Sequence, residues 1–146
     1  MQLVIYFLFL SSGCFESFPI IKNLVTFPDS SSTFDCNISK NVYIDHDVII
    51  GNNVKIQNGV SVYNGVTLED DIFLGPSSTF TNDLLPRSRS ENWQVIPTLV
   101  KKGVSVGANA TILCGVILGE YSMIGAGAVV ISNTLPHSLM VGNPAR

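Results

Sequence analysis

Residues 54–76 read VKIQNGVSVYNGVTLEDDIFLGP, and the spacing of their aliphatic side chains is the most informative feature of the chain. One aliphatic residue recurs at every sixth position, and in most repeats a second follows it after four residues. The pattern extends to both sides of this stretch. The leading residues are Ile38, Ile44, Ile50, Ile56, Val62, Leu68, Leu74, Val100, Val106, Ile112, Leu118, Ile124 and Val130. A repeat of six residues therefore organises the chain.

The six-residue period fits neither a helix nor an isolated strand. An amphipathic helix places apolar residues three and four apart, and a lone strand alternates without a turn residue at every sixth position. Two inward positions per repeat predict a short strand and a corner, and three such units close a triangular coil of about 18 residues. The corners hold residues that accept positive φ, such as Gln57-Asn58-Gly59 and Gly125-Ala126-Gly127. We therefore expect an all-β fold, a parallel β-helix, rather than a β-sandwich with chance periodicity; the pattern leaves its handedness open.

Composition limits the function further. The chain has 146 residues, of which 46% are hydrophobic and 13% charged, so it is one globular domain rather than a disordered segment. The formal net charge of −3 argues against nucleic-acid or acidic-membrane partners, which attract clustered Lys and Arg. The three cysteines show no metal-ligand spacing and leave one unpaired. We expect no metal, no membrane association and a reducing, cytoplasmic location.

The amino-terminal residues 1–35 do not follow the repeat. Leu3 to Leu10 is an apolar run, too short for a bilayer span of about 20 residues. It has the length of a signal-peptide core, but no Lys or Arg precedes it. We favour an irregular cap over a cleaved signal.

The repeat slips once, between Phe80 and Val100, which are separated by 20 residues where a multiple of six would give 18. Part of the chain must therefore leave the coil at about 82–98. Long excursions from regular scaffolds are more often functional than accidental. We expect a β-helix domain over 36–135 with this loop, followed by a carboxyl-terminal tail, 136–146, after Pro136 ends the repeats.

Several strings within residues 36–146 are similar to one known family. They are the stretch 54–76, FTN (80–82), PRS (86–88), PTLVKKG (97–103), GANATILCG (107–115), IGAGAVV (124–130) and GNPAR (142–146). On these strings the chain resembles the hexapeptide-repeat acyltransferases, and more narrowly the nucleotide-amino-sugar N-acetyltransferases, such as the UDP-2-acetamido-3-amino-2,3-dideoxy-glucuronate N-acetyltransferases of polysaccharide biosynthesis. The resemblance implies a homotrimer of left-handed β-helices with acetyl-CoA in the grooves between subunits. It also implies acetyl transfer to the amine of a UDP- or dTDP-linked sugar.

Residues 18 apart lie in one column of such a coil, about 4.8 Å from each other. His46, Asn64 and Asn82 form one column. From the FTN string, the resemblance implies that Asn82 is the catalytic residue, orienting the sugar amine or the acetyl carbonyl. The alternative is a corner asparagine that bonds only its own backbone. His46 lies two coils from Asn82, about 10 Å, so an exposed turn histidine is the favoured interpretation.

The substrate is expected to contact Asn64 and Tyr63 of the YNG string, together with Arg87 and Arg89 in the excursion. The forked guanidinium groups suit a pyrophosphate or a sugar carboxylate. The resemblance also implies a difference, because relatives commonly carry Glu at the position of Asn64. If that Glu contacts the substrate amine, this chain lacks at this position the carboxylate that could hold an ammonium group or take its proton. Arg89 has the alternative of being an ordinary loop charge.

The coenzyme is expected along a second column of small residues. Ala108 and Ala126 lie 18 apart, with Pro144 a further 18 along. Small side chains there would let a pantetheine arm lie against the backbone. The resemblance adds Gly107 and Gly125 of the GAN and GAG strings, and Arg146 for the coenzyme phosphates. The alternative is that small residues merely suit tight corners.

Acetyl transfer to an amine needs few catalytic groups, because an unprotonated amine attacks a thioester without the base that an alcohol requires. We expect no strong general base, so replacing His46 by Ala should leave turnover nearly intact; a loss of about 10³-fold would reject this. A γ-class carbonic anhydrase needs three histidine ligands, and the chain has two histidines. A hydroxyl acetyltransferase of the same fold and a non-catalytic β-solenoid scaffold remain as alternatives.

Overall fold

The computed structural model describes residues 25–26, 35–90 and 93–146. In these residues the chain forms short strands and no helix. The strands are β1 (Val25–Thr26), β2 (Asn37–Ile38), β3 (Tyr43–Ile44), β4 (Val48–Ile50), β5 (Lys55–Ile56), β6 (Ser61–Val62), β7 (Val66–Leu68), β8 (Phe73–Leu74), β9 (Thr79–Phe80), β10 (Thr98–Val100), β11 (Ser105–Val106), β12 (Thr111–Ile112), β13 (Ile117–Leu118), β14 (Met123–Ile124), β15 (Val129–Val130) and β16 (Leu139–Met140).

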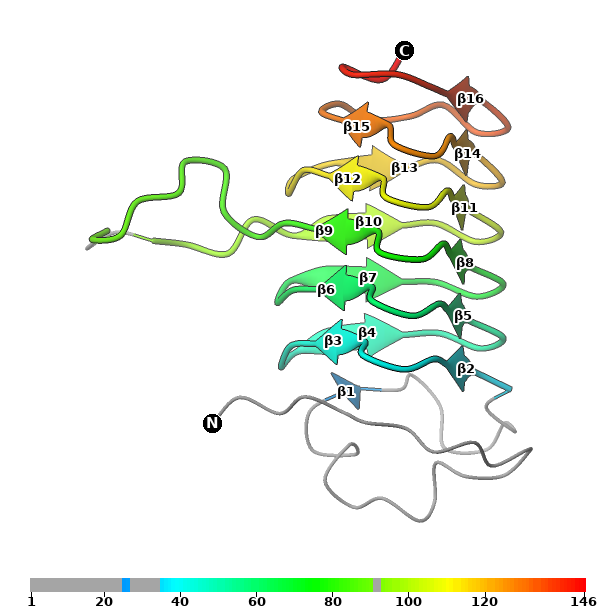
Figure 1. Ribbon diagram of the computed structural model, residues 1–146, viewed down its shortest axis with the longest axis horizontal. Coiled ribbons are helices and arrows are strands. Elements are labelled where there is room, and N and C mark those ends of the chain that lie inside the picture. The colour runs from blue at the N-terminus through cyan, green and yellow to red at the C-terminus, as the bar shows by residue number, and fades with distance from the viewer. Residues whose placement is uncertain (1–24, 27–34, 91–92) are drawn as a thin grey trace.

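The strands form three parallel sheets, one on each side of a stack of coils (Figure 1). Sheet 1 has the order β1-β4-β7-β10-β13, sheet 2 the order β16-β14-β11-β8-β5-β2, and sheet 3 the order β15-β12-β9-β6-β3. Each strand pairs with the strand one coil away, as Ile50 does with Leu68 and Ile44 with Val62. The predicted all-β fold of stacked six-residue units is confirmed as a parallel β-solenoid.

The core is the interior of the stack. Both aliphatic series of the repeat point into it, and Ile50, Ile56 and Leu74 are fully buried. Burying each such side chain contributes about 1.5–3 kcal/mol of hydrophobic stabilisation. Because strand residues alternate in direction, the residues between these, such as Lys55 and Phe73, face outward and are exposed. The repeat therefore specifies both the core and the register.

One coil contains an insertion between β9 and β10. Leu68 pairs with Val100 across 32 residues, whereas Ile50 pairs with Leu68 across 18, so this coil carries 14 additional residues. The described residues between Phe80 and Thr98 form no strand, and Figure 1 shows the segment reaching away from the stack. Its returning end is anchored, because the Thr98 N–H donates to the Gly65 carbonyl at 3.0 Å.

The carboxyl-terminal segment corrects one expectation, because Pro136 does not end the strand series. β16 follows it and pairs with β14, Met123 opposite Leu139. Pro136 lies at a corner, against Gly119 of the preceding coil, where its fixed φ and missing N–H are tolerated. The buried Ala145 then closes the stack, its N–H donating to the Val129 carbonyl at 2.8 Å.

The interpretation of Leu3–Leu10 as part of a cap or a signal falls outside the described residues. Of residues 1–35, β1 and Asp35 are described, and β1 pairs with β4 at the end of sheet 1. Within the described ranges, no helix has the length and apolar character that crossing a bilayer requires.

Candidate functional site

Two corner columns of the solenoid hold most of the predicted site residues. The histidine corner connects sheet 3 to sheet 1 and comprises turns 45–47, 63–65 and 113–115, with residues 81–83 at the start of the insertion. The glycine corner connects sheet 2 to sheet 3 and comprises turns 75–77, 107–109 and 125–127. One side of the solenoid, sheet 3, separates the two corners.

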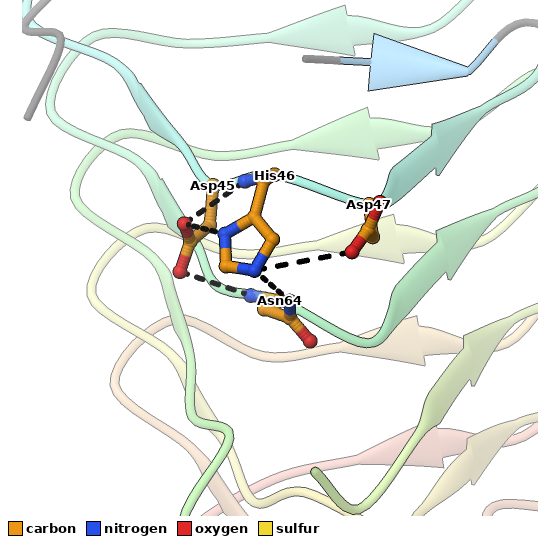
Figure 2. Close-up of polar contacts among 4 residues, drawn as sticks. All are labelled: Asp45, His46, Asp47 and Asn64. Carbon is orange, nitrogen blue, oxygen red and sulfur yellow. Dashed lines mark hydrogen bonds and ion pairs between the residues drawn. The ribbon is translucent and has the colours of Figure 1, made fainter. Parts of the chain in front are cut away.

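At the histidine corner, His46 bonds to residues on both sides (Figure 2). Its Nδ1 lies 2.8 Å from Asp45 Oδ1, and its Nε2 lies 2.7 Å from Asn64 Nδ2 of the next coil. The Asn64 backbone N–H also donates to Asp45 Oδ2, at 3.4 Å. Asp47 is the more distant neighbour, with Oδ2 3.9 Å from Nε2. Asp45, His46 and Asn64 therefore form one hydrogen-bonded cluster, the Asp-His-Asn cluster.

The protonation of the imidazole follows from its partners. An amide NH₂ group can only donate, so Asn64 Nδ2 donates to His46 Nε2, which must carry a lone pair. The ring proton then resides on Nδ1 and is donated to Asp45 Oδ1. In this arrangement both ring nitrogens of His46 are engaged, Nδ1 by Asp45 and Nε2 by Asn64.

The Asp45 carboxylate is held in its ionised form. Partial burial on its own would raise the pKa of Asp45, but the hydrogen bonds from the His46 side chain and backbone and from the Asn64 backbone outweigh it. The pKa of Asp45 is therefore lowered from its ordinary value. A carboxylate that stays ionised keeps the ring proton on the Nδ1 side of His46.

The 18-residue spacing predicted that His46 and Asn64 lie within contact distance. It predicted no functional role for the histidine, and it did not identify Asp45 as a site residue. The imidazole is exposed, as expected, with 61% of its side chain accessible. However, its side chain bonds to residues of two coils, whereas a solvated turn histidine would contact only water. The available signal was the Asp-His-Asp triplet at 45–47, read together with the 18-residue spacing to Asn64.

Tyr63 lies next to the cluster. Its ring centroid is 5.1 Å from that of Tyr43 on the preceding coil, with the planes tilted by 53°. Such a tilted pair is a favourable aromatic geometry. Tyr63 is 36% exposed, so one side of the pair remains open next to Asn64.

Asn82 continues the column at the point where the insertion begins. Phe80 pairs with Val62, so Asn82 and Asn64 each lie two residues beyond a paired position. The neighbouring Thr81 is fixed by two bonds, its N–H to the Ile112 carbonyl and its Oγ1 from the Cys114 N–H, at 2.9 and 3.0 Å. The Asn82 side chain is half-buried and bonds to no other described residue. It is therefore free to bind a ligand.

The two arginines are not brought to this column in the described structure. Arg87 and Arg89 are exposed in the insertion. Arg87 donates to the adjacent Pro86 carbonyl at 2.8 Å, its one hydrogen bond within residues 35–90 and 93–146. Among the described residues, neither guanidinium contacts Asn64 or Asn82.

At the glycine corner the coils approach closely. A side chain at Gly107 would meet the Ala126 backbone nitrogen at 2.5 Å, and one at Gly75 would meet Ala108 N at 2.7 Å. A groove of about 350 Å³ runs beside them, lined by Gly107, Gly125 and Ala126. Phe73 and Met123 supply its apolar wall. Gly107, Gly125 and Ala126 are thus brought together as predicted from their strings.

The edge of this groove offers unused hydrogen-bond donors. In the described part of the chain, the backbone N–H groups of Ala108 and Ala126 donate to no acceptor. Two free donors beside an apolar wall match an extended chain that carries amide carbonyls between methylene groups. Pro144 and Arg146 are exposed in the last turn, and the Arg146 backbone is paired with Val141 through bonds of 3.1 Å.

A second groove, of about 330 Å³, lies beside Glu69, Asp70 and Lys102 and contains none of the predicted site residues. A search for metal sites gives no cluster of three or more His, Cys, Asp or Glu side chains within the described ranges.

The repeat is that of a known protein family. The chain matches the bacterial transferase hexapeptide family, described as six repeats, over residues 47–82 and 97–132. These ranges contain most strands of all three sheets and end on both sides of the insertion. The chain belongs to this hexapeptide-repeat family.

Individual relatives agree with this assignment. The chain is 55% identical over 49 residues to dTDP-3-amino-3,6-dideoxy-alpha-D-galactopyranose 3-N-acetyltransferase of Aneurinibacillus thermoaerophilus, covering 34% of this chain and 26% of that protein. The chain thus spans only about a quarter of that curated relative.

Solved structures share the fold. A hexapeptide-repeat acetyltransferase from Vibrio cholerae, complexed with acetyl coenzyme A, is 25% identical with a TM-score of 0.69, over 84% of this chain and 68% of that chain. A maltose O-acetyltransferase from Clostridium difficile is 20% identical with a TM-score of 0.70, over 86% and 70% respectively.

Proposed function

We propose that the protein is an acetyl-CoA-dependent N-acetyltransferase that acts on the amine of a UDP- or dTDP-linked amino sugar. The observation that carries the proposal is the 55% identity to a dTDP-amino-sugar N-acetyltransferase over 49 residues. Family membership supports the acyl transfer, and the relative supports the substrate class. The solenoid is proposed to be left-handed, as the resemblance implies.

The donor is proposed to bind at the glycine corner. Support comes from the groove of about 350 Å³ and from the free N–H groups of Ala108 and Ala126. The small residues Gly107 and Gly125 leave the backbone accessible to the pantetheine arm. The last coil is offset by 16 residues, Met123 pairing with Leu139, so Gly142 and not Pro144 continues the column above Ala126. Pro144 and Arg146 are exposed in the turn beyond Gly142, and the Arg146 guanidinium is proposed to meet the coenzyme phosphates. The V. cholerae relative with acetyl coenzyme A bound supports the choice of donor.

The acceptor is proposed to bind at the histidine corner, with its amine oriented by Asn82 and contacted by Asn64 and Tyr63. The amine nitrogen attacks the thioester carbonyl carbon and forms the C–N bond. The C–S bond then breaks, the amine loses a proton to solvent, and coenzyme A leaves as its thiol. Positioning and oxyanion stabilisation supply the rate, and no side chain acts as a strong general base. Arg87 and Arg89 are proposed to bind the sugar-nucleotide pyrophosphate.

A homotrimer is proposed because the two corners are separated within one chain. Six residues connect equivalent positions of the two corners, such as Ala108 and Cys114, a path of up to about 20 Å. Sheet 3 lies between the two corners, so a thioester held at one corner does not lie beside an amine at the other corner of the same chain. A neighbouring copy that brings its histidine corner to the glycine corner would complete the site.

Acetylation of a hydroxyl is the second candidate function. The fold is shared with a maltose O-acetyltransferase, so the fold alone does not choose between an amine and a hydroxyl. A hydroxyl needs a general base, and the insertion at 82–98 contains no histidine. The histidine at this corner, His46, has both ring nitrogens engaged by Asp45 and Asn64, which favours the amine. A scaffold that binds a nucleotide sugar without turnover is the remaining alternative.

The test is thiol release from acetyl-CoA in the presence of UDP- and dTDP-linked amino sugars, each paired with the matching hydroxyl sugar. We expect release with at least one amino sugar, together with a product heavier by one acetyl group on nitrogen. Release with the hydroxyl sugars alone would support O-acetylation. Binding of coenzyme A without release for any acceptor would support the scaffold.

A further inference from the structure

The hydrogen bonds of the Asp-His-Asn cluster run in one direction, and this direction determines how the cluster can bind an amine. Nδ1–H of His46 points to Asp45 and the Nε2 lone pair points to the Asn64 NH₂ group. The Asn64 carbonyl oxygen lies on the side away from the imidazole, as Figure 2 shows. Among the described residues this oxygen accepts no hydrogen bond. The cluster therefore presents an acceptor, and not a donor, beyond Asn64.

We propose that Asp45 and His46 are positioning residues that hold the Asn64 amide in one orientation, with its carbonyl oxygen presented to the acceptor amine. This inference rests on the proposed function, in which Asn64 contacts that amine. The imidazole fixes which end of the amide faces the acceptor and takes no proton from it.

The orientation matters because of how an amine attacks. A neutral amine has N–H donors and one lone pair, and the lone pair must stay free to attack the thioester carbonyl. The Asn64 carbonyl oxygen accepts an N–H and leaves that lone pair available. The NH₂ group of a reversed amide would donate to the lone pair and hold the amine unreactive. One orientation therefore supports attack and the other opposes it.

Asp45 sets the orientation through the tautomer of the ring. With Asp45 Oδ1 accepting from Nδ1–H, Nε2 is left as an acceptor and selects the Asn64 NH₂ group. A ring with its proton on Nε2 would select the Asn64 carbonyl oxygen and reverse the amide. Asp45 also accepts the Asn64 backbone N–H, so one carboxylate fixes the residue at both its main chain and, through His46, its side chain.

Burial makes the arrangement stable enough to have a function. Asn64 is only 8% exposed, so water competes poorly for its amide. Asp47 is the other charged group near the ring, and its distance of 3.9 Å from Nε2 is too long for a hydrogen bond. Replacing Asp47 therefore provides a matched control next to the same ring.

The first test measures the tautomer of His46 by ¹⁵N NMR of the free protein. The chain has only two histidines, His46 and His137, so His46→Gln assigns the spectrum by difference. We expect the proton of His46 on Nδ1 and a nitrogen–nitrogen coupling across the hydrogen bond to Asn64. A proton on Nε2 would overturn the inference, whether or not the protein is active.

The second test compares three substitutions at His46 by the kinetics of acetyl transfer. Glutamine offers a carbonyl acceptor in place of Nε2 and is expected to stay within about threefold of wild-type kcat. Alanine removes the acceptor and is expected to lower kcat about tenfold, the effect of one hydrogen bond. This replaces the nearly intact turnover expected from the sequence alone, because the structure bonds His46 to Asn64. Lysine offers only donors and is expected to lower kcat further. The acceptor KM and the coenzyme Kd should change less than about threefold in each.

These outcomes separate the inference from the proposed function. Equal losses for His46→Gln and His46→Ala, or a loss of about 10³-fold for His46→Ala, would overturn the inference, because the latter is the effect of losing a general base. The Asp47→Asn control should match wild type; a loss equal to that of His46→Ala would indicate a structural effect of the turn and overturn the inference. No transfer by the wild type to any acceptor would overturn the proposed function and the inference together.

Discussion

Asn82 and Asn64 occupy successive positions of one column, yet they are held very differently. Asn64 is bonded through its backbone and its side chain, whereas the Asn82 side chain bonds to no other described residue. Unused polar groups held beside a well-fixed neighbour are typical of ligand-binding positions. Asn82 is therefore the residue from which we expect the largest effect on transfer.

Replacing Asn82 by Ala should lower kcat/KM by about 10²-fold, because misplacing the attacking amine by about 1 Å costs on the order of 10²-fold. The coenzyme Kd, measured by calorimetry, should not change, since the glycine corner is untouched. Asn37→Ala, on the exposed face of β2 away from both corners, is the control and should match wild type. An unchanged kcat/KM for Asn82→Ala would contradict its role.

The lowered pKa of Asp45 makes a prediction about stability in acid. Burial opposes the shift, but the bonds from His46 and Asn64 outweigh it, so the folded-state pKa lies below the ordinary value of 3.8. Asp45 therefore stabilises the fold above about pH 4, and this contribution is lost as the pH falls through the lower folded-state value.

The comparison is urea unfolding of wild type and Asp45→Asn between pH 7 and pH 2. The variant should be less stable at neutral pH, and the difference in unfolding free energy should shrink below about pH 4. A difference that stays constant over this range would show that the carboxylate is not preferentially ionised in the folded state.

Side-chain columns were predictable from the sequence, but side-chain contacts were not. The 18-residue spacing placed His46 beside Asn64, and the structure confirms their contact. The role of Asp45 depends on its rotamer and on the ring tautomer, which the spacing does not encode. For the same reason, whether Arg87 and Arg89 meet the substrate stays a prediction.

Among the elements, the insertion and the corner it returns to are coupled through Gly65. This glycine has φ +87°, and a methyl group there would overlap the Val95 side chain. Gly127 has φ +70° at the glycine corner with open space around its Cα. Gly65 and Gly127 both require a positive φ, but only Gly65 has a side chain packed against it. Substitutions at the two positions therefore form a matched pair.

Gly127→Ala should lower the free energy of unfolding by about 1–2 kcal/mol, the strain of a left-handed alanine. Gly65→Ala should lower it by a further 1–3 kcal/mol or so, because Val95 must move. Denaturant unfolding measures both. Equal losses would contradict the packing of the returning segment on Gly65.

The six-residue period predicted the strand positions, but the prediction that Pro136 ends the repeats was wrong. A proline that breaks a helix or a central strand is tolerated at a corner, and the segment after it resumes pairing as β16. The slip of the repeat predicted that part of the chain leaves the coil between Phe80 and Val100, but it did not give the 14 additional residues of this coil. The path of the insertion was not predictable either, because no repeat constrains it.

At the scale of the whole molecule, the stacked coils were predictable from the sequence. Every repeat places aliphatic residues at the same inward positions. Association between copies is not encoded in this way, since it depends on the outward residues. Those of sheet 2 include Phe73, Met123 and Leu139, which are 37%, 55% and 61% exposed. An apolar stripe of this kind favours contact with another protein surface.

In the proposed function, one site is assembled from two corners of neighbouring copies, and mixed trimers test this most directly. Asn82→Ala disables the histidine corner, and Ala126→Tyr fills the groove at the glycine corner. Each variant alone should retain no more than about a hundredth of wild-type transfer.

The measurement is acetyl transfer by trimers assembled from equal amounts of the two variants, with mixing verified by native mass spectrometry. If each site takes one corner from each of two copies, about a quarter of the sites combine two intact corners. We therefore predict recovery to about a quarter of the wild-type rate. Verified mixed trimers that stay at the level of the single variants would contradict the account.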